Sequence, residues 1–295
     1  MRMLIVSTGA DALAKPVRPG ADALAHQAVT ALIDEATLTP KPGLVDFRGR
    51  GAHRDLDWML MCHSAWALHP GFCAMAEAGA SGMHTQGLRE RIGRIGRQAE
   101  ATMMQATGGV NTHRGAIWAL GLLVTAAAES TTATTAAAVA ARAGEIARHE
   151  DRFAPASTGN KGAAACRLYG VGGARGQAQA GFPHLVETAL PCLRAARLRG
   201  DDENTARLNA LLSLVAELDD TCVLSRGGSV ALASVQSGAA GVLAAGGAAT
   251  THGQRALRRL EADMLARNVS PGGAADLLAA TLFLDRLVPA AWTDA

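Results

Sequence analysis

The chain has 295 residues, of which 49% are hydrophobic, and a formal net charge of +2, so it can bury the core of one large domain. Only 3% of the residues are aromatic, so a basic groove lined with stacking rings, as nucleic-acid binding needs, is not indicated. The five cysteines are odd in number and form no CxxC pair, which argues against a disulfide framework or a zinc ribbon and favours a cytoplasmic protein with reduced thiols.

The first twenty residues are expected to form a loose N-terminus, and residues 21–295 a single all-α catalytic domain. The apolar patch near the start spans about four residues, whereas a signal peptide needs roughly 7 to 15. From Gly227 to Gln254 the chain has no Asp, Glu, Lys or Arg, but Ala, Gly, Ser and Thr dominate this stretch. Its hydrophobicity predicts a buried, closely packed helix and no membrane span.

Apolar residues recur at three- and four-residue steps along most of the chain, and each series predicts one apolar stripe on a helix. Clear series start at Ile117, Leu208, Leu257 and Leu277. The Ala-rich tract Ser130–Ala141 fits a capped helix. Alternating strand patterns are absent, so the sequence predicts an all-α protein of about ten helices.

The breaks between these helices are rich in glycine together with Asp, Asn, His, Lys or Arg. They run through Thr39–Asp55, Thr107–Ala116, Ser157–Pro183, Leu218–Gly228 and Asn268–Leu278. The first is longer than the roughly 2 to 8 residues that join packed helices, which suggests a binding site. No linker between domains and no fixed-period repeat is evident, so the charged loops are expected to form one nucleotide pocket on a single domain.

The first break begins with the sequence TPKPG, in which Pro40 and Pro42 disfavour helix and Gly43 permits a left-handed turn. Lys41 is then held on a stiff, extended stretch, where its ammonium can act as a counter-charge for a phosphate. The alternative is a plain helix stop with a solvated lysine.

Further along this break, Asp46, His53, Asp55 and Asp57 lie close together in sequence. They are suited to binding a ribose or a hard cation such as Mg²⁺, which prefers carboxylate oxygens. Alternatively, Asp55 is the N-cap of the helix that carries Trp58.

The second break places Asn111, Thr112, His113 and Arg114 directly before a strongly apolar helix. The free N–H groups and positive dipole end of a helix N-terminus suit a phosphate, and Arg114 adds a charge nearby. Capping of the helix by Asn111 or Thr112 is the alternative.

In the third break, Lys161 and Arg175 lie among glycines that let a ligand approach the backbone, although the spacing matches neither a Walker nor a Rossmann motif. In the fourth, Asp219 and Asp220 are expected at the end of an apolar helix, where the dipole disfavours anions unless a cation or an arginine offsets them. Arg226, followed by two glycines, resembles an anion-binding turn.

The fifth break carries normal helix-start signals. Ser270 is a potential cap, and Pro271 suits the first helical position. Asp276, in the first turn, is expected simply to complement the helix dipole.

Six ordered motifs between Glu35 and Leu284 carry a family resemblance. They are EATLTPKPGLVD, GAHRDLDWM, GVNTHRGAIWALGLL, GGARGQAQAGFP, LDDTCVLSRGG and SPGGAADLLAATLFL. The set resembles the triphosphoribosyl-dephospho-coenzyme A synthases, which make the prosthetic-group precursor for the acyl carrier subunits of citrate lyase and malonate decarboxylase. The Ala-rich, stand-alone form favours the malonate decarboxylase branch. One departure is Arg114, where many relatives are expected to have lysine, and the change alters the hydrogen-bonding geometry.

The resemblance implies that ATP donates its triphosphoribosyl group to the ribose 2′-hydroxyl of 3′-dephospho-coenzyme A, with release of adenine and with Mg²⁺ accompanying ATP. For this reaction we assign substrate and phosphate binding, as a hypothesis, to a set of mostly cationic residues, namely Lys41, Asn111, His113, Arg114, Lys161, Arg175 and Arg226. The residues expected to bind Mg²⁺ are Asp55, Asp219 and Asp220. The candidates for ribose binding or proton transfer are Glu35, Asp46 and His53.

Two other functions remain open at this point. An all-α, Mg²⁺-dependent hydrolase of ADP-ribose-type linkages would also use acidic pairs near helix ends, with water as nucleophile. A helical interaction scaffold would not explain the many glycine-framed charged loops. Partners expected for the synthase are its two substrates and a separate transferase that passes the product to a carrier protein. Neither nucleic acid nor a membrane is expected, and a homo-oligomer stays open.

Overall fold

The computed structural model describes residues 19–129, 135–155 and 159–287. These residues form helices and no β-strand, which confirms the all-α prediction. The helices are α1 (Ala21–Thr37), α2 (Trp58–Ala67), α3 (His69–Ala80), α4 (Thr85–Ala106), α5 (Arg114–Glu129), α6 (Ala136–Arg148), α7 (Lys161–Tyr169), α8 (Gly173–Gln179), the π-helix η1 (His184–Ala189), α9 (Leu190–Leu198), α10 (Glu203–Glu217), α11 (Thr221–Ala244), α12 (Thr251–Ala266) and α13 (Gly272–Leu287). Residues 1–18, most of the predicted loose N-terminus, lie outside the described part.

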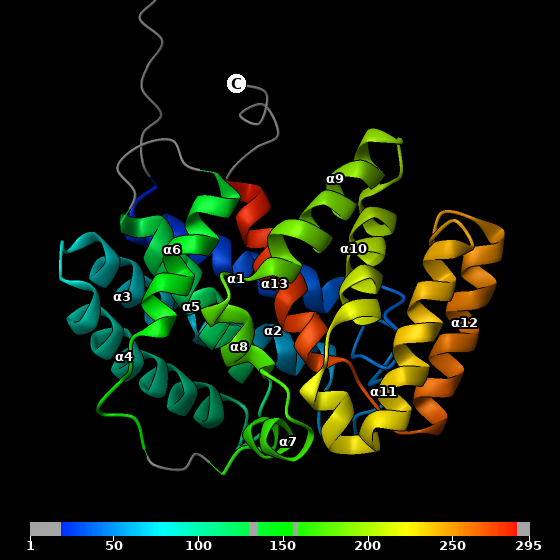
Figure 1. Ribbon diagram of the computed structural model, residues 1–295, viewed down its shortest axis with the longest axis horizontal. Coiled ribbons are helices and arrows are strands. Elements are labelled where there is room, and N and C mark those ends of the chain that lie inside the picture. The colour runs from blue at the N-terminus through cyan, green and yellow to red at the C-terminus, as the bar shows by residue number, and fades with distance from the viewer. Residues whose placement is uncertain (1–18, 130–134, 156–158, 288–295) are drawn as a thin grey trace, which may run out of the picture.

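The core is built around α1, α5 and α13, which pack against one another. Helix α5 is buried almost continuously from Ala116 to Ala128, and α13 from Ala274 to Leu284, as their apolar composition requires. Figure 1 shows α3, α4 and α6 on one side of these helices, and α11 with α12 on the other. The glycine-rich breaks directly precede α5, α11 and α13, so the packing of these helices fixes the positions of the breaks.

The uncharged segment that begins at Gly227 forms most of α11. The backbone of this helix is kinked at Gly228, where φ is 70° and ψ is −170°. Among the described helices, α11 alone is long and apolar enough to cross a membrane. Here it packs between α10 and α12, and a Cβ on Gly238 would lie 2.7 Å from Leu260, which is the close packing predicted. The predicted burial is wrong in part, because Val230 is 73% exposed.

Asp220 ties two helix N-termini together. Helix α10 has already ended at Glu217, and Asp220 is the N-cap of α11, where one carboxylate oxygen accepts from the Cys222 N–H at 2.8 Å. The other oxygen accepts from the Ala274 N–H of α13 at 2.9 Å. The sequence placed Asp220 at the C-terminus of a helix, where the dipole disfavours a negative charge. This prediction is wrong, because Asp220 lies at the N-terminus of α11, where the dipole favours a negative charge.

Two other caps can be compared with their predictions. The N-cap of α2 is Asp57, whose side chain accepts from the Leu60 N–H, so the alternative role proposed for Asp55 as the cap is wrong. The N-cap of α6 is Thr135, whose side chain accepts from the Ala138 N–H. Within the described residues, this confirms the capped helix that was predicted for the Ala-rich tract.

Replacing Asp220 by Ala should lower the free energy of unfolding by about 2 to 4 kcal/mol, because two helices lose their caps and buried N–H groups lose their acceptors. Urea unfolding followed by circular dichroism measures the loss. Asp202→Ala, which removes an exposed cap from α10 alone, is the matched control and should cost less. Equal losses for the two variants would contradict the double role of Asp220.

Candidate active site

Lys41 and Glu35 form a buried ion pair at the end of α1. Lys41 is 2% and Glu35 4% exposed, and Lys41 Nζ lies 2.5 Å from Glu35 Oε1 and 2.6 Å from the Glu35 carbonyl oxygen. The sequence suggested that Lys41 is either an open phosphate contact or a solvated lysine. Its burial agrees with neither. Lys41 is instead the internal counter-charge of Glu35, which was predicted as a catalytic candidate.

Asp46 organises the loop that follows Lys41. Its buried carboxylate accepts from the Lys41 N–H at 2.9 Å, from Thr39 Oγ1 at 3.1 Å, and from the Arg48 N–H and Nε at 2.7 and 2.9 Å. Burial alone would raise the pKa of Asp46, but the hydrogen bonds from Arg48 and Lys41 hold it below its ordinary value. Asp46 is thus a saturated, ionised carboxylate with little capacity left for proton transfer.

His53 connects this loop to the starts of α11 and α13. Its Nδ1 lies 3.1 Å from Arg226 Nη2, and its Nε2 lies 2.9 Å from Ser270 Oγ. Arginine can only donate, so Nδ1 is the acceptor and Nε2 carries the proton. Burial and the charge of Arg226 lower the pKa of His53 to about 4, while Asp55 opposes them. His53 is therefore a neutral imidazole at pH 7.

The second break brings His113 close to Lys41. We call the buried group of Glu35, Lys41 and His113 the buried centre. The His113 side chain is 2% exposed, and neither ring nitrogen has a hydrogen-bond partner. Burial and the charge of Lys41 lower the pKa of His113 to about 4. Asn111 accepts from the Arg114 N–H at 3.2 Å, as the capping alternative predicts, and Arg114 itself pairs with Glu100 of α4.

Asp276 is a candidate site residue that the sequence predicted only to complement a helix dipole. A Cβ added to Gly115 would overlap the Asp276 carboxylate, which therefore lies on the first turn of α5. Burial and the negative charges of Glu35 and Asp220 raise the pKa of Asp276 well above its ordinary value, against a hydrogen bond from the Ala116 N–H. No local pattern could reveal this contact, because it joins helices that are far apart in sequence.

The remaining predicted phosphate ligands are exposed cations close to the start of α11. Lys161 is the first residue of α7, and Arg175 belongs to α8. A Cβ on Gly162 or Gly173 would lie 3.4 or 3.2 Å from the Thr221 side chain, so α7 and the first residue of α8 lie beside the first residue of α11, while α8 itself packs against α6 and α5. The two cations are thus on elements that border the buried centre.

The predicted metal ligands do not form a ready-made centre. Asp55 and Asp219 are exposed, and both oxygens of Asp220 accept backbone N–H groups. Within the described residues, no group of three or more His, Cys, Asp or Glu side chains is placed to hold a metal ion.

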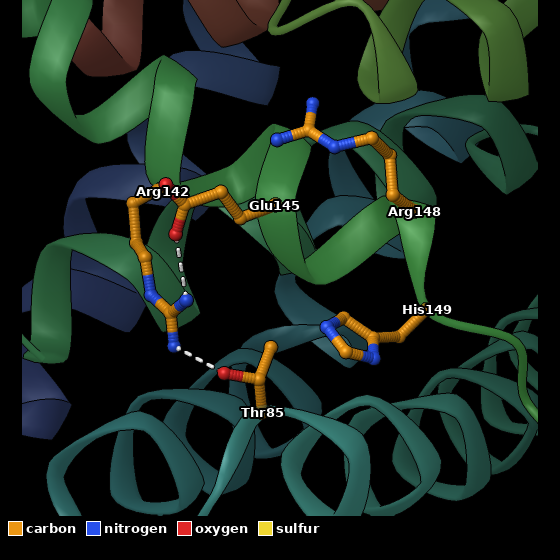
Figure 2. A pocket seen from close by; sticks show the side chains of 5 residues that line it. All are labelled: Thr85, Arg142, Glu145, Arg148 and His149. Atoms are coloured by element: carbon orange, nitrogen blue, oxygen red, sulfur yellow. Dashed lines mark hydrogen bonds and ion pairs between the residues drawn. The ribbon is translucent and has the colours of Figure 1, made fainter.

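A separate hollow of about 460 Å³ lies between the start of α4 and the end of α6. Figure 2 shows its lining, which consists of Thr85, Arg142, Glu145, Arg148 and His149. None of these is a predicted site residue. Arg142 is already paired with Glu129 and Glu145, and Arg148 donates to the Gln179 carbonyl oxygen, so the hollow offers little uncompensated charge.

A family model described as ATP:dephospho-CoA triphosphoribosyl transferase matches residues 21–294. The chain belongs to this family. It is therefore an enzyme of the transferase class, and the family match spans every residue assigned above.

Individual relatives agree with the family match. A protein of Azotobacter vinelandii, named probable 2-(5''-triphosphoribosyl)-3'-dephosphocoenzyme-A synthase, is 57% identical over 270 residues, which is 91% of this chain and 92% of the relative. The Klebsiella pneumoniae protein named 2-(5''-triphosphoribosyl)-3'-dephosphocoenzyme-A synthase is 56% identical over 264 residues, 90% of this chain and 94% of its own length. No solved structure matches the chain.

The buried, unpaired His113 should make stability depend on pH. Its folded-state pKa of about 4 lies below the ordinary value of 6.5, so the unfolded chain takes up the proton first as the pH falls. The contribution of neutral His113 to the free energy of unfolding is complete above about pH 6.5. It falls as the pH decreases towards 4, and about 2 to 3 kcal/mol is lost at pH 4.5. His113→Gln should remove this part of the pH dependence in urea unfolding, while the exposed His252→Gln should not. An unchanged slope in His113→Gln would contradict the assignment.

Proposed function

We propose that the enzyme transfers the 5-triphosphoribosyl group of ATP to the ribose 2′-hydroxyl of 3′-dephospho-coenzyme A and releases adenine. The observation that carries this proposal is the family match over residues 21–294, which includes all the motifs that frame the buried centre. The relatives from Azotobacter and Klebsiella, which are named as synthases of this product, support it.

The arrangement of helix ends suits the triphosphate. Asp220 joins the N-termini of α11 and α13, and Asp276 joins α13 to the N-terminus of α5, so three positive dipole ends lie near one another. Lys161 is the first residue of α7 and Arg175 lies on α8, and both supply exposed positive charge near the start of α11. These groups would hold phosphates without forming covalent bonds to them.

Mg²⁺ is proposed to arrive as part of the substrate, Mg·ATP. The ion keeps several waters and is commonly held by phosphates with one or two carboxylates, which needs no all-protein cage. Asp219 is the exposed carboxylate closest in sequence to the start of α11, whereas Asp220 is committed to capping. The proposal therefore gives Asp220 a structural role and leaves the metal to the nucleotide.

The reaction separates a sugar from a base, so positive charge develops on the ribose in the transition state. A nearby carboxylate such as Glu35 stabilises that charge. The hydroxyl of dephospho-coenzyme A must also lose a proton. Neutral His53 is suited to accept one, provided that its hydrogen bond to Arg226 opens.

We also propose that the product serves a malonate decarboxylase carrier protein, reached through a separate transferase, in the cytoplasm. The Ala-rich composition of the chain and its five free cysteines support these assignments. The alternative of an all-α hydrolase would use water instead of dephospho-coenzyme A.

Purified protein should release adenine only when ATP, Mg²⁺ and 3′-dephospho-coenzyme A are all present. Chromatography with mass detection should show a second product that carries an added triphosphoribosyl group. Omission of each component in turn is the control. Adenine formed without dephospho-coenzyme A would support the hydrolase, and no adenine under any condition would overturn the proposed transfer.

Lys161→Ala should raise the KM for ATP about tenfold, with a smaller effect on kcat, because one phosphate contact worth about 1.4 kcal/mol is lost. The side chain is exposed, so the thermal stability should stay unchanged. Arg258→Ala, at an exposed position on α12, is the control for loss of a surface cation. An unaltered KM for ATP in Lys161→Ala would remove this residue from the phosphate site.

A further inference from the structure

Asp276 has an unusual position among the buried acids of this protein. Its carboxyl group lies on Gly115 in the first turn of α5 and accepts a hydrogen bond from the Ala116 N–H. Unlike Glu35 and Asp220, which are almost completely buried, Asp276 keeps part of its surface accessible. It is thus the most exposed of these three acidic residues.

The other two carboxylates already have partners that hold their negative charge. Glu35 is bound to Lys41, and Asp220 accepts N–H groups from the starts of α11 and α13. Asp276 has the backbone of α5 and two carboxylates as neighbours. Burial and both negative charges favour its neutral, protonated form, which raises its pKa.

A second feature indicates that this centre receives a ligand. His113 directly precedes α5, is 2% exposed and has no hydrogen-bond partner at either ring nitrogen. Burial lowers the pKa of this imidazole, and Lys41 lies close enough to lower it further, which links His113 to the Glu35–Lys41 pair and so to the surroundings of Asp276. Buried polar groups without partners are rare and costly, and they are commonly satisfied by a ligand or an ordered water.

We propose that Asp276 is the catalytic general acid that protonates the departing adenine. This inference rests on the proposed triphosphoribosyl transfer. As the bond between C1 of the ribose and N9 breaks, its electron pair leaves with adenine, and the Asp276 carboxyl donates its proton to a ring nitrogen of the base. The 2′-hydroxyl oxygen of dephospho-coenzyme A bonds to C1, and its proton passes to neutral His53, which releases it to solvent. The Asp276 carboxylate takes up one proton from solvent, so both residues end the cycle in their starting protonation states.

This role has a clear structural rival. Asp276 could serve only to cap α5 from a neighbouring helix, because its carboxyl already accepts from the Ala116 N–H. An amide keeps such an acceptor but cannot donate an acidic proton. Asp276→Asn therefore separates the two roles, since capping survives the change and proton donation does not.

The test compares ATP with N7-methylated ATP as donors. The methylated base carries a positive charge and leaves as a neutral molecule without receiving a proton. In Asp276→Asn, kcat with ATP should fall about 10²- to 10⁴-fold, the range typical of a lost general acid. With the methylated donor, the variant should stay within about tenfold of the wild type. An equal loss with both donors, or no loss with ATP, would overturn the proposal.

Gly115→Ala provides an independent variant in which Asp276 remains but its carboxyl is displaced by the new Cβ. It should show the same selective loss with ATP. Gly241→Ala is the matched control, because a Cβ there meets no atom within 4 Å. Its kcat should equal that of the wild type with both donors.

The unmodified enzyme supplies a readout that does not depend on the folding of any variant. Its kcat with ATP should decrease at alkaline pH as the acid is deprotonated, and this decrease should be absent with the methylated donor. Identical pH profiles would contradict proton donation to the base. Failure of the wild type to release adenine from ATP at all would instead overturn the proposed transfer, so the two failures are distinguishable.

Discussion

Burial of the Lys41 ammonium is the constraint on which the rest of the site depends. An isolated buried charge is so unfavourable that the fold must provide a partner, and Glu35 supplies both a carboxylate and a carbonyl oxygen. The end of α1 and the following loop are fixed together as a result, with Asp46 holding the Lys41 backbone. The same pair adds to the electrostatics around it. Burial and the charge of Lys41 together keep His113 neutral, and burial and the charge of Glu35 together disfavour a negative charge on Asp276.

The second organising element is the meeting of three helix N-termini. The starts of α5, α11 and α13 are joined by two carboxyl groups, those of Asp220 and Asp276. Positive dipole ends and exposed cations then surround a buried acidic centre, which is a suitable environment for a phosphorylated sugar whose ring becomes positive during the reaction. The hollow beside Arg142 lacks this combination, because its charges are already paired (Figure 2).

Sequence patterns predicted the all-α class and the breaks that carry the candidate site, because helical periodicity and glycine-rich loops are local signals. They did not predict which charges are buried. The sequence predicts Lys41 as an open phosphate ligand, but in the fold its side chain is buried at the end of α1. The sequence places Asp220 at the end of one helix, but Asp220 is the N-cap of the next helix, α11. The contact of Asp276 with Gly115 joins helices that are far apart in the chain, so only tertiary structure reveals it.

A crystal structure of the enzyme with bound Mg·ATP, in the absence of dephospho-coenzyme A, would decide whether the buried centre is the active site. We expect the triphosphate beside the starts of α7 and α11, and the bond between ribose and adenine within reach of Asp276. Nucleotide bound in the hollow between α4 and α6, or on any face distant from the Glu35–Lys41 pair, would contradict this expectation.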